Sequence, residues 1–117
     1  MKKTYSLHDI RQWEALKEEA QRSRGVVIFK LSPICPISLA AERELDAWYE
    51  GISEEANVIG AKIDVIASRP LSQHIAQELG VEHQSPQVIW ITPQGKVQWH
   101  TSHRSITIDN LRSAIGL

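Results

Sequence analysis

One stretch of sequence decides how this chain folds: Gly25-Val26-Val27-Ile28-Phe29-Lys30-Leu31-Ser32-Pro33-Ile34-Cys35-Pro36-Ile37-Ser38. Its first seven residues are apolar apart from Lys30 and include β-branched and aromatic side chains, which predicts a strand buried on both faces. Pro33 breaks that strand, and Pro36 is typical of the first position of a helix. The stretch therefore predicts a strand, a tight turn and a helix, with Cys35 at the turn.

Cys35 is the only cysteine of the chain. A sulfur at the start of a helix lies at the positive end of the helix dipole, where the free N–H groups of Ile37 and Ser38 favour the thiolate. The Ser38 hydroxyl, one turn further on, can also donate a hydrogen bond to the sulfur. The ordinary alternative for a lone cysteine is a small buried hydrophobe. The flanking prolines and the position between strand and helix favour a reactive thiol, which Pro36 would present rigidly.

Length and composition restrict the class of protein. A chain of 117 residues is expected to form one domain over residues 1–117. A single cysteine excludes an intrachain disulfide and indicates a reducing, cytoplasmic compartment. No apolar run approaches the roughly 20 residues that cross a bilayer, so we expect a soluble protein without a membrane partner. With 13 basic and 14 acidic residues, the net charge of −1 argues against nucleic acid as a partner and favours a protein or a small molecule.

Helical and strand patterns alternate along the chain, which is typical of an α/β fold. We expect helices over residues 7–23, 36–52, 69–79 and 106–115, with Ser6 as the cap of the first. We expect strands over residues 26–31, 57–65, 87–91 and 96–100, the last two joined by a hairpin turn at residues 92–95. A short additional strand near residues 3–5 would precede the first helix.

This order of elements resembles the thioredoxin fold, in which a central mixed sheet is flanked by helices. Cys35-Pro36-Ile37-Ser38 matches the Cys-x-x-Cys position of that fold, with serine at the resolving place. Ser85-Pro86 precedes a strand and matches its cis-proline step, although a strand-start proline is ordinarily trans. In the cis form the Ser85 backbone can pair with an extended substrate, so Ser85 and Pro86 are expected to form one wall of the substrate groove.

A narrower resemblance, to the monothiol bacilliredoxins, covers nearly the whole chain. It is carried by Phe29-Lys30, Cys35-Pro36-Ile37-Ser38, Arg69-Pro70-Leu71-Ser72, Gly80-Val81, His83-Gln84-Ser85-Pro86-Gln87 and Trp99-His100-Thr101-Ser102-His103-Arg104 with Ile106-Thr107. It implies a monothiol oxidoreductase that uses Cys35 to remove bacillithiol, a cysteine-glucosamine-malate thiol, from mixed disulfides on proteins. The implied partners are bacillithiolated proteins and bacillithiol itself, as co-substrate. Gln84 stands where the family usually has an acidic residue, which leaves the substrate preference open.

The malate carboxylates of bacillithiol require hydrogen-bond donors or positive charge near the sulfur. The candidates are Lys30, Arg69, His103 and Arg104, together with the free amides that open the last helix. For Arg69 and Arg104 the alternative is a solvated surface charge, and for Lys30 a side chain that extends over the edge of the sheet.

Two kinds of cofactor site and two other functions are the alternatives to this interpretation. The pair His100 and His103 lacks further ligands at a zinc spacing, so no metal site is expected. Monothiol glutaredoxins that hold an iron-sulfur cluster carry Cys-Gly-Phe-Ser, and Pro36 replaces that glycine, so no cofactor is expected. The other functions are a non-catalytic thioredoxin-fold stress-response module whose Cys35 is modified without turnover, and a redox sensor that forms an intermolecular Cys35 disulfide.

Overall fold

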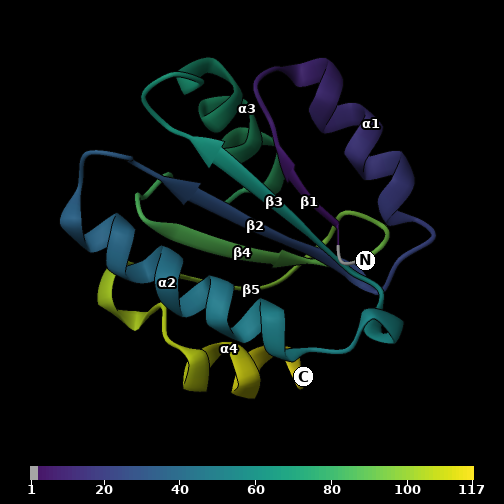
Figure 1. Cartoon of the computed structure of the whole chain (residues 1–117). Coiled ribbons are helices and arrows are strands. Elements are labelled where there is room, and N and C mark those ends of the chain that lie inside the picture. Colours follow the sequence, from purple (N-terminus) through teal and green to yellow (C-terminus); the bar gives the residue numbers. More distant parts are fainter. Residues whose placement is uncertain (1–2) are drawn as a thin grey trace.

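The computed structural model describes residues 3–117, and a five-stranded sheet forms its centre (Figure 1). The strands are β1 (Lys3–Ser6), β2 (Gly25–Leu31), β3 (Val58–Asp64), β4 (Gln87–Ile91) and β5 (Val97–Ser102). Their order across the sheet is β1-β3-β2-β4-β5. The first three are parallel, whereas β4 runs antiparallel to β2 and β5 antiparallel to β4. The apolar run that predicts a doubly buried strand is therefore the middle strand, β2.

Helices cover both faces of the sheet, as an α/β fold requires (Figure 1). One face carries α1 (Ile10–Ala20) and α3 (Arg69–Leu79), and the other carries α2 (Pro36–Gly51) and α4 (Ile108–Ile115). Two short 3-10 turns, η1 (Glu54–Ala56) and η2 (His103–Ser105), complete the chain. Alternate side chains of β2 enter the two cores, with Val26 and Ile28 on the α1/α3 face and Val27 and Phe29 on the α2/α4 face.

Two helix starts differ from the prediction. The first helix begins at Ile10, and its N-cap is Asp9, whose carboxylate accepts a hydrogen bond from the Gln12 amide at 2.9 Å. Ser6 cannot cap it because Ser6 is the last residue of β1, paired with Lys62 of β3. The last helix begins at Ile108 rather than at residue 106, since Thr107 takes extended backbone and caps it. Sheet pairing moves the start of the first helix, and the extended backbone at Thr107 moves the start of the last one.

Gly25 marks the start of β2, where the backbone passes close to β4. Its φ of +149° lies in a region that side-chain-bearing residues rarely adopt. A Cβ at this position would lie 2.6 Å from both the Ile91 carbonyl oxygen and the Trp90 ring. Glycine at this position therefore allows the start of β2 to pack this closely against β4.

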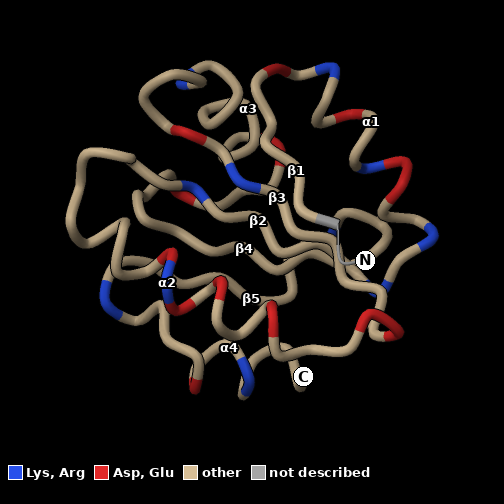
Figure 2. Tube along the Cα trace, in the orientation of Figure 1, with Lys and Arg blue, Asp and Glu red and all other residues tan. Residues whose placement is uncertain are grey.

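Charged residues of both signs are mixed over the helices and the strand edges (Figure 2). On β3, for example, Lys62 forms ion pairs with Glu42 and Asp46 of α2. Within residues 3–117, none of the helices combines the length and the apolar character needed to cross a membrane.

Candidate active site

Cys35 lies at the edge of the sheet where β2 ends, as the N-cap residue of α2. Its backbone is extended, with φ −101° and ψ 121°, and Pro36 follows as the first helical residue. The Cys35 amide donates to the Ser32 carbonyl at 3.2 Å, which closes the turn between strand and helix. The thiol is partly exposed, so a substrate disulfide can reach the sulfur.

The surroundings of Cys35 favour the thiolate. Hydrogen bonds from the backbone amides of Ser38 and then Ile37 lower the pKa of the Cys35 thiol, and the Ser38 hydroxyl adds to the effect. Ser38 is fully buried, and its Oγ also accepts a hydrogen bond from the Ser32 amide at 3.1 Å. That bond fixes the oxygen, so its proton is directed at the sulfur. The three donors predicted for Cys35 are therefore in place.

The Ser85–Pro86 peptide bond is cis and lies at the same edge of the sheet as Cys35. Gln87, the next residue, pairs with Lys30 across β2 and β4, which sets Pro86 beside the end of β2. The Pro86 carbonyl accepts a hydrogen bond from the His103 amide at 2.9 Å. His103 has a φ of +55°, in the left-handed region that is uncommon outside glycine. This strained backbone ties the η2 turn to the cis-proline segment.

A groove of about 420 Å³ opens between α2 and the η2 turn. Its residues are Pro36, Ile37, Ala40, Ala41 and Glu44 from α2, and His103, Arg104, Ile106 and Thr107 from η2 and the segment after it. The α2 wall is mostly apolar, whereas Ile106 is the one apolar side chain among the four residues of the η2 wall. The α2 residues lie on one helix face, next to Cys35. Of these five residues, only Pro36 was predicted from the sequence to bind substrate, although the helical spacing of the other four places them on the same face.

Charged and polar groups lie at the η2 side of this groove. His103 and Arg104 are both exposed there, as the predicted anion site requires. Glu44 on the opposite wall is held in place, because its Oε1 accepts a hydrogen bond from the Ile108 amide at 3.1 Å at the start of α4. His103, Arg104 and Pro36 are thus brought to one groove beside Cys35.

Lys30 does not lie at the anion site predicted from the sequence. Its side chain is 0% exposed and points to the α3 face of the sheet, where its Nζ donates to the Ser72 carbonyl at 2.9 Å. A group so deeply buried cannot contact malate, and it does not extend over the sheet edge either. Arg69 is exposed at the first turn of α3, in the region of His83, whose pKa it helps to lower. The groove residues do not include Lys30 or Arg69.

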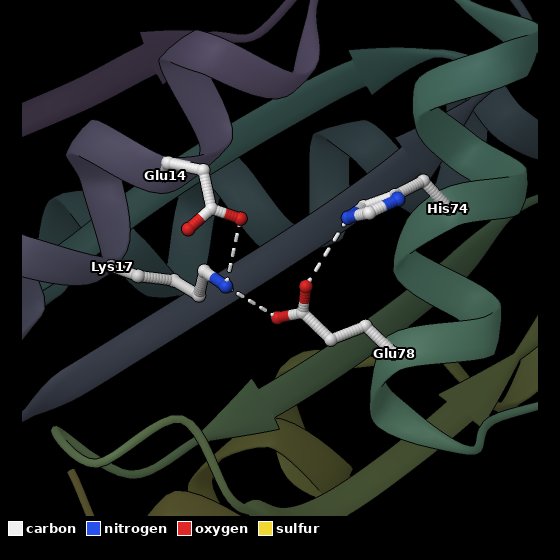
Figure 3. Close-up of polar contacts among 4 residues, drawn as sticks. All are labelled: Glu14, Lys17, His74 and Glu78. Atoms are coloured by element: carbon white, nitrogen blue, oxygen red, sulfur yellow. Dashed lines mark hydrogen bonds and ion pairs between the residues drawn. The ribbon is translucent and has the colours of Figure 1, made fainter.

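One cluster away from Cys35 has the composition of a metal site. Glu14 of α1 and His74 and Glu78 of α3 have ligand atoms within 4.8 Å of one another (Figure 3). The Lys17 ammonium lies between the two carboxylates, 3.0 Å from Glu14 and 2.6 Å from Glu78. A divalent cation would have to displace this ammonium. The cluster is an ion-pair network that joins α1 to α3.

Comparisons with known proteins agree with this geometry. The chain matches the family described as "Monothiol bacilliredoxin BrxC" over residues 5–111. It is similar to a solved structure with a thioredoxin fold, described provisionally as an oxidoreductase, at 28% identity and a TM-score of 0.81 over 96% of this chain and 93% of that one. Thioredoxin from Fasciola hepatica is 22% identical, with a TM-score of 0.73 over 99% of this chain and 97% of that one. Thioredoxin NaTrxh from Nicotiana alata is 18% identical, with a TM-score of 0.71 over 97% and 90%. The predicted thioredoxin-like fold is confirmed.

Proposed function

The chain belongs to the monothiol bacilliredoxin family, and from that premise we propose that it removes bacillithiol from mixed disulfides on proteins, with Cys35 as the nucleophile. The observation that carries the proposal is the setting of Cys35. Its sulfur receives two backbone amides and the Ser38 hydroxyl, and the chain contains no second cysteine to resolve a disulfide. A mixed disulfide on Cys35 can therefore be resolved only by a thiol from another molecule.

In the first step, the Cys35 thiolate attacks the bacillithiol sulfur of a protein–bacillithiol disulfide. A bond forms between Cys35 and bacillithiol, and the original disulfide bond breaks. The protein sulfur leaves with the electron pair and takes a proton from water. The amides of Ile37 and Ser38 favour the attacking thiolate at neutral pH because they lower the pKa of the thiol.

In the second step, the thiolate of a second bacillithiol attacks the bacillithiol sulfur held on Cys35. This releases bacillithiol disulfide and restores the Cys35 thiolate. In the whole cycle the protein–bacillithiol disulfide and one bacillithiol thiol are converted into a protein thiol and bacillithiol disulfide. The reaction needs bacillithiol as reductant and no bound cofactor, and it suits a reducing cytoplasm.

We assign the bound bacillithiol to the groove between α2 and η2. The groove begins at Pro36, the residue after the reactive Cys35, and its apolar α2 wall suits the body of a small ligand. His103 and Arg104 offer donors and positive charge for the malate carboxylates. The client backbone pairs with Ser85 at the cis-proline step, as a strand adds to the edge of a sheet.

Intact mass spectrometry after brief mixing with a bacillithiolated protein tests the proposal. Rapid appearance of the protein with one bacillithiol on Cys35, and its loss in Cys35→Ser, is the expected result. A glutathionylated protein serves as the second substrate, and slower transfer from it is expected. Arg104→Ala should slow transfer, whereas the matched control Arg112→Ala, an exposed arginine of α4 outside the groove, should not.

The same experiment separates the other functions. Labelling of Cys35 no faster than that of a free thiol would replace the enzyme with a non-catalytic module. A disulfide-linked dimer on non-reducing electrophoresis, in place of the bacillithiol adduct, would favour the redox sensor. Either result would contradict the proposed reaction.

A further inference from the structure

Lys30 is buried in a way that lysine rarely is. Its side chain has no exposed surface, and none of the carboxylates in residues 3–117 forms an ion pair with it. Burial lowers its pKa to about 8, which reflects the cost of holding an ammonium away from water. An apolar side chain of similar length would fill the same space without that cost. We therefore look for the role of Lys30 in the contacts that its amine makes.

The amine joins three segments of the chain at the α3 face of the sheet. From β2, Lys30 Nζ donates to the Ser72 carbonyl of α3 at 2.9 Å. It also lies 3.2 Å from Nδ1 of His83, and the Ser72 hydroxyl lies 3.3 Å from the same nitrogen. Burial, Lys30 and Arg69 lower the pKa of His83, which favours the neutral ring. Because the Lys30 ammonium can only donate, Nδ1 of that ring is the acceptor of the contact. The imidazole proton is then on Nε2.

A second buried side chain holds the same segment. Gln87 of β4 lies opposite Lys30 in the β2–β4 ladder and is 1% exposed. Its Nε2 donates to the Glu82 carbonyl at 2.9 Å. In the same region Ser85 Oγ and Gln87 Oε1 are buried without a hydrogen-bond partner, so they do not fix the segment. The side-chain bonds that hold residues 82–87 therefore come from Lys30, Ser72 and Gln87.

The held segment is the one that carries the Ser85–Pro86 step. Before this step, the His83 side chain is bonded to Lys30. At the step itself, the Pro86 carbonyl accepts a hydrogen bond from the His103 amide. Both ends of the cis-proline step are thus fixed, one by Lys30 and the other by the η2 turn. Lys30 itself touches no solvent and cannot touch a substrate.

We propose that the contact between Lys30 and His83, here called the latch, positions the Ser85–Pro86 wall beside Cys35 for the incoming protein substrate. Lys30 is then a positioning residue, and the latch rests on the proposed function only for its effect on transfer. The charged and titratable groups that face it are Arg69 and His83, and the neutral ones are Ser72 and Gln87. Without the latch the segment keeps its chain path but loses its fixed distance to the α3 face.

Amide NMR spectra of the full chain test the latch without reference to activity. Lys30→Met and His83→Leu remove it, whereas His83→Asn keeps an acceptor near the position of Nδ1. We expect the amide signals of Ser85, Gln87 and His103 to shift in the first two variants and to return toward their wild-type positions in His83→Asn. The matched control is Lys62→Met. Lys62 is partly buried on the opposite face of the sheet, so this variant should leave these signals in place.

Transfer kinetics supply the second readout. Loss of one hydrogen bond is worth about a fivefold change, so Lys30→Met should raise the client concentration for half-maximal rate about fivefold. His83→Leu, which also removes the contact with the Ser72 hydroxyl, should raise it at least as much. The pKa of Cys35 and its rate with a small disulfide should not change. Unchanged signals in residues 82–87, or equal effects of His83→Leu and His83→Asn, would overturn the latch. If the wild-type protein transfers no bacillithiol, the proposed function fails, while the NMR comparison still decides the latch.

Discussion

The burial of Lys30 predicts a stability that rises with pH in an alkaline interval. The pKa of this lysine falls from the ordinary 10.5 to about 8 because burial penalises the ammonium. Between these two values the unfolded chain binds a proton that the folded chain does not. The free energy of unfolding therefore increases as pH rises through that interval. Below pH 8 both states are protonated and the full cost is present.

The magnitude follows from the same two values. Each tenfold difference in proton affinity corresponds to about 1.4 kcal/mol, so the drop to about 8 amounts to about 3 kcal/mol. Lys17 and Lys62 act in the opposite direction, since ion pairs raise their pKa values and their contribution is lost at higher pH. These terms, and that of Cys35, are the same in wild type and in Lys30→Met, and His83, whose pKa Lys30 helps to lower from 6.5, titrates below the interval from about 8 to 10.5. The difference between the two proteins isolates Lys30.

Urea unfolding at several pH values from 7 to 10.5, followed by tryptophan fluorescence under reducing conditions, measures this difference. Relative to Lys30→Met, the wild type should gain about 3 kcal/mol between about pH 8 and pH 10.5. Lys62→Met serves as the control: the pKa of Lys62 is raised above 10.5 in the folded chain, so the difference in stability between it and the wild type should stay nearly constant up to about pH 10. Parallel curves for wild type and Lys30→Met would refute the reasoning, because they would mean that Lys30 ionises alike in the folded and unfolded chain.

Three further predictions concern the thiol, the central strand and the groove. Ser38→Ala should raise the pKa of Cys35 while leaving it below that of a free thiol, since two amide donors remain; thiolate absorbance against pH measures this, and an unchanged titration would remove Ser38 from the mechanism. Gly25→Ala should cost about 2 kcal/mol or more in urea unfolding, because its Cβ would lie 2.6 Å from atoms of β4; a neutral result would contradict the close approach. Glu44→Ala should cost about 1 kcal/mol by the same method through loss of the acceptor for Ile108, whereas Glu44→Gln should keep most of it.

The strand-turn-helix at Cys35 was predictable because its determinants are local. An apolar run, two prolines and a serine one turn after the cysteine specify the strand, the helix start and the donors to the sulfur. The resemblance to known folds and families, rather than local sequence, predicted the cis Ser85–Pro86 bond and the roles of His103 and Arg104. In the structure that bond is cis, and His103 and Arg104 line one groove. Local sequence could not set the width of that groove, because its far wall comes from a segment about seventy residues away.

The place of Lys30 could not be predicted for a related reason. A lysine within an apolar run suggests an edge or an exposed strand end. Here Ser72 and His83, both more than forty residues away, supply the acceptors that make burial tolerable. The start of the first helix shows the same limit, since pairing of Ser6 with β3 moves the cap to Asp9. In each case the deciding partner is distant in sequence.

Ser38 stands where a dithiol protein would have its second cysteine, and it also supports the backbone of the turn that carries Cys35. Its buried Oγ accepts the Ser32 amide and so holds together the turn from which Cys35 projects. A thiol is a weak acceptor and a larger atom, so cysteine in this place would loosen the turn while supplying a second sulfur. Converting this scaffold into a dithiol reductase by one substitution would therefore weaken the support of the nucleophile it aims to assist. An engineer would first have to give the Ser32 amide another partner.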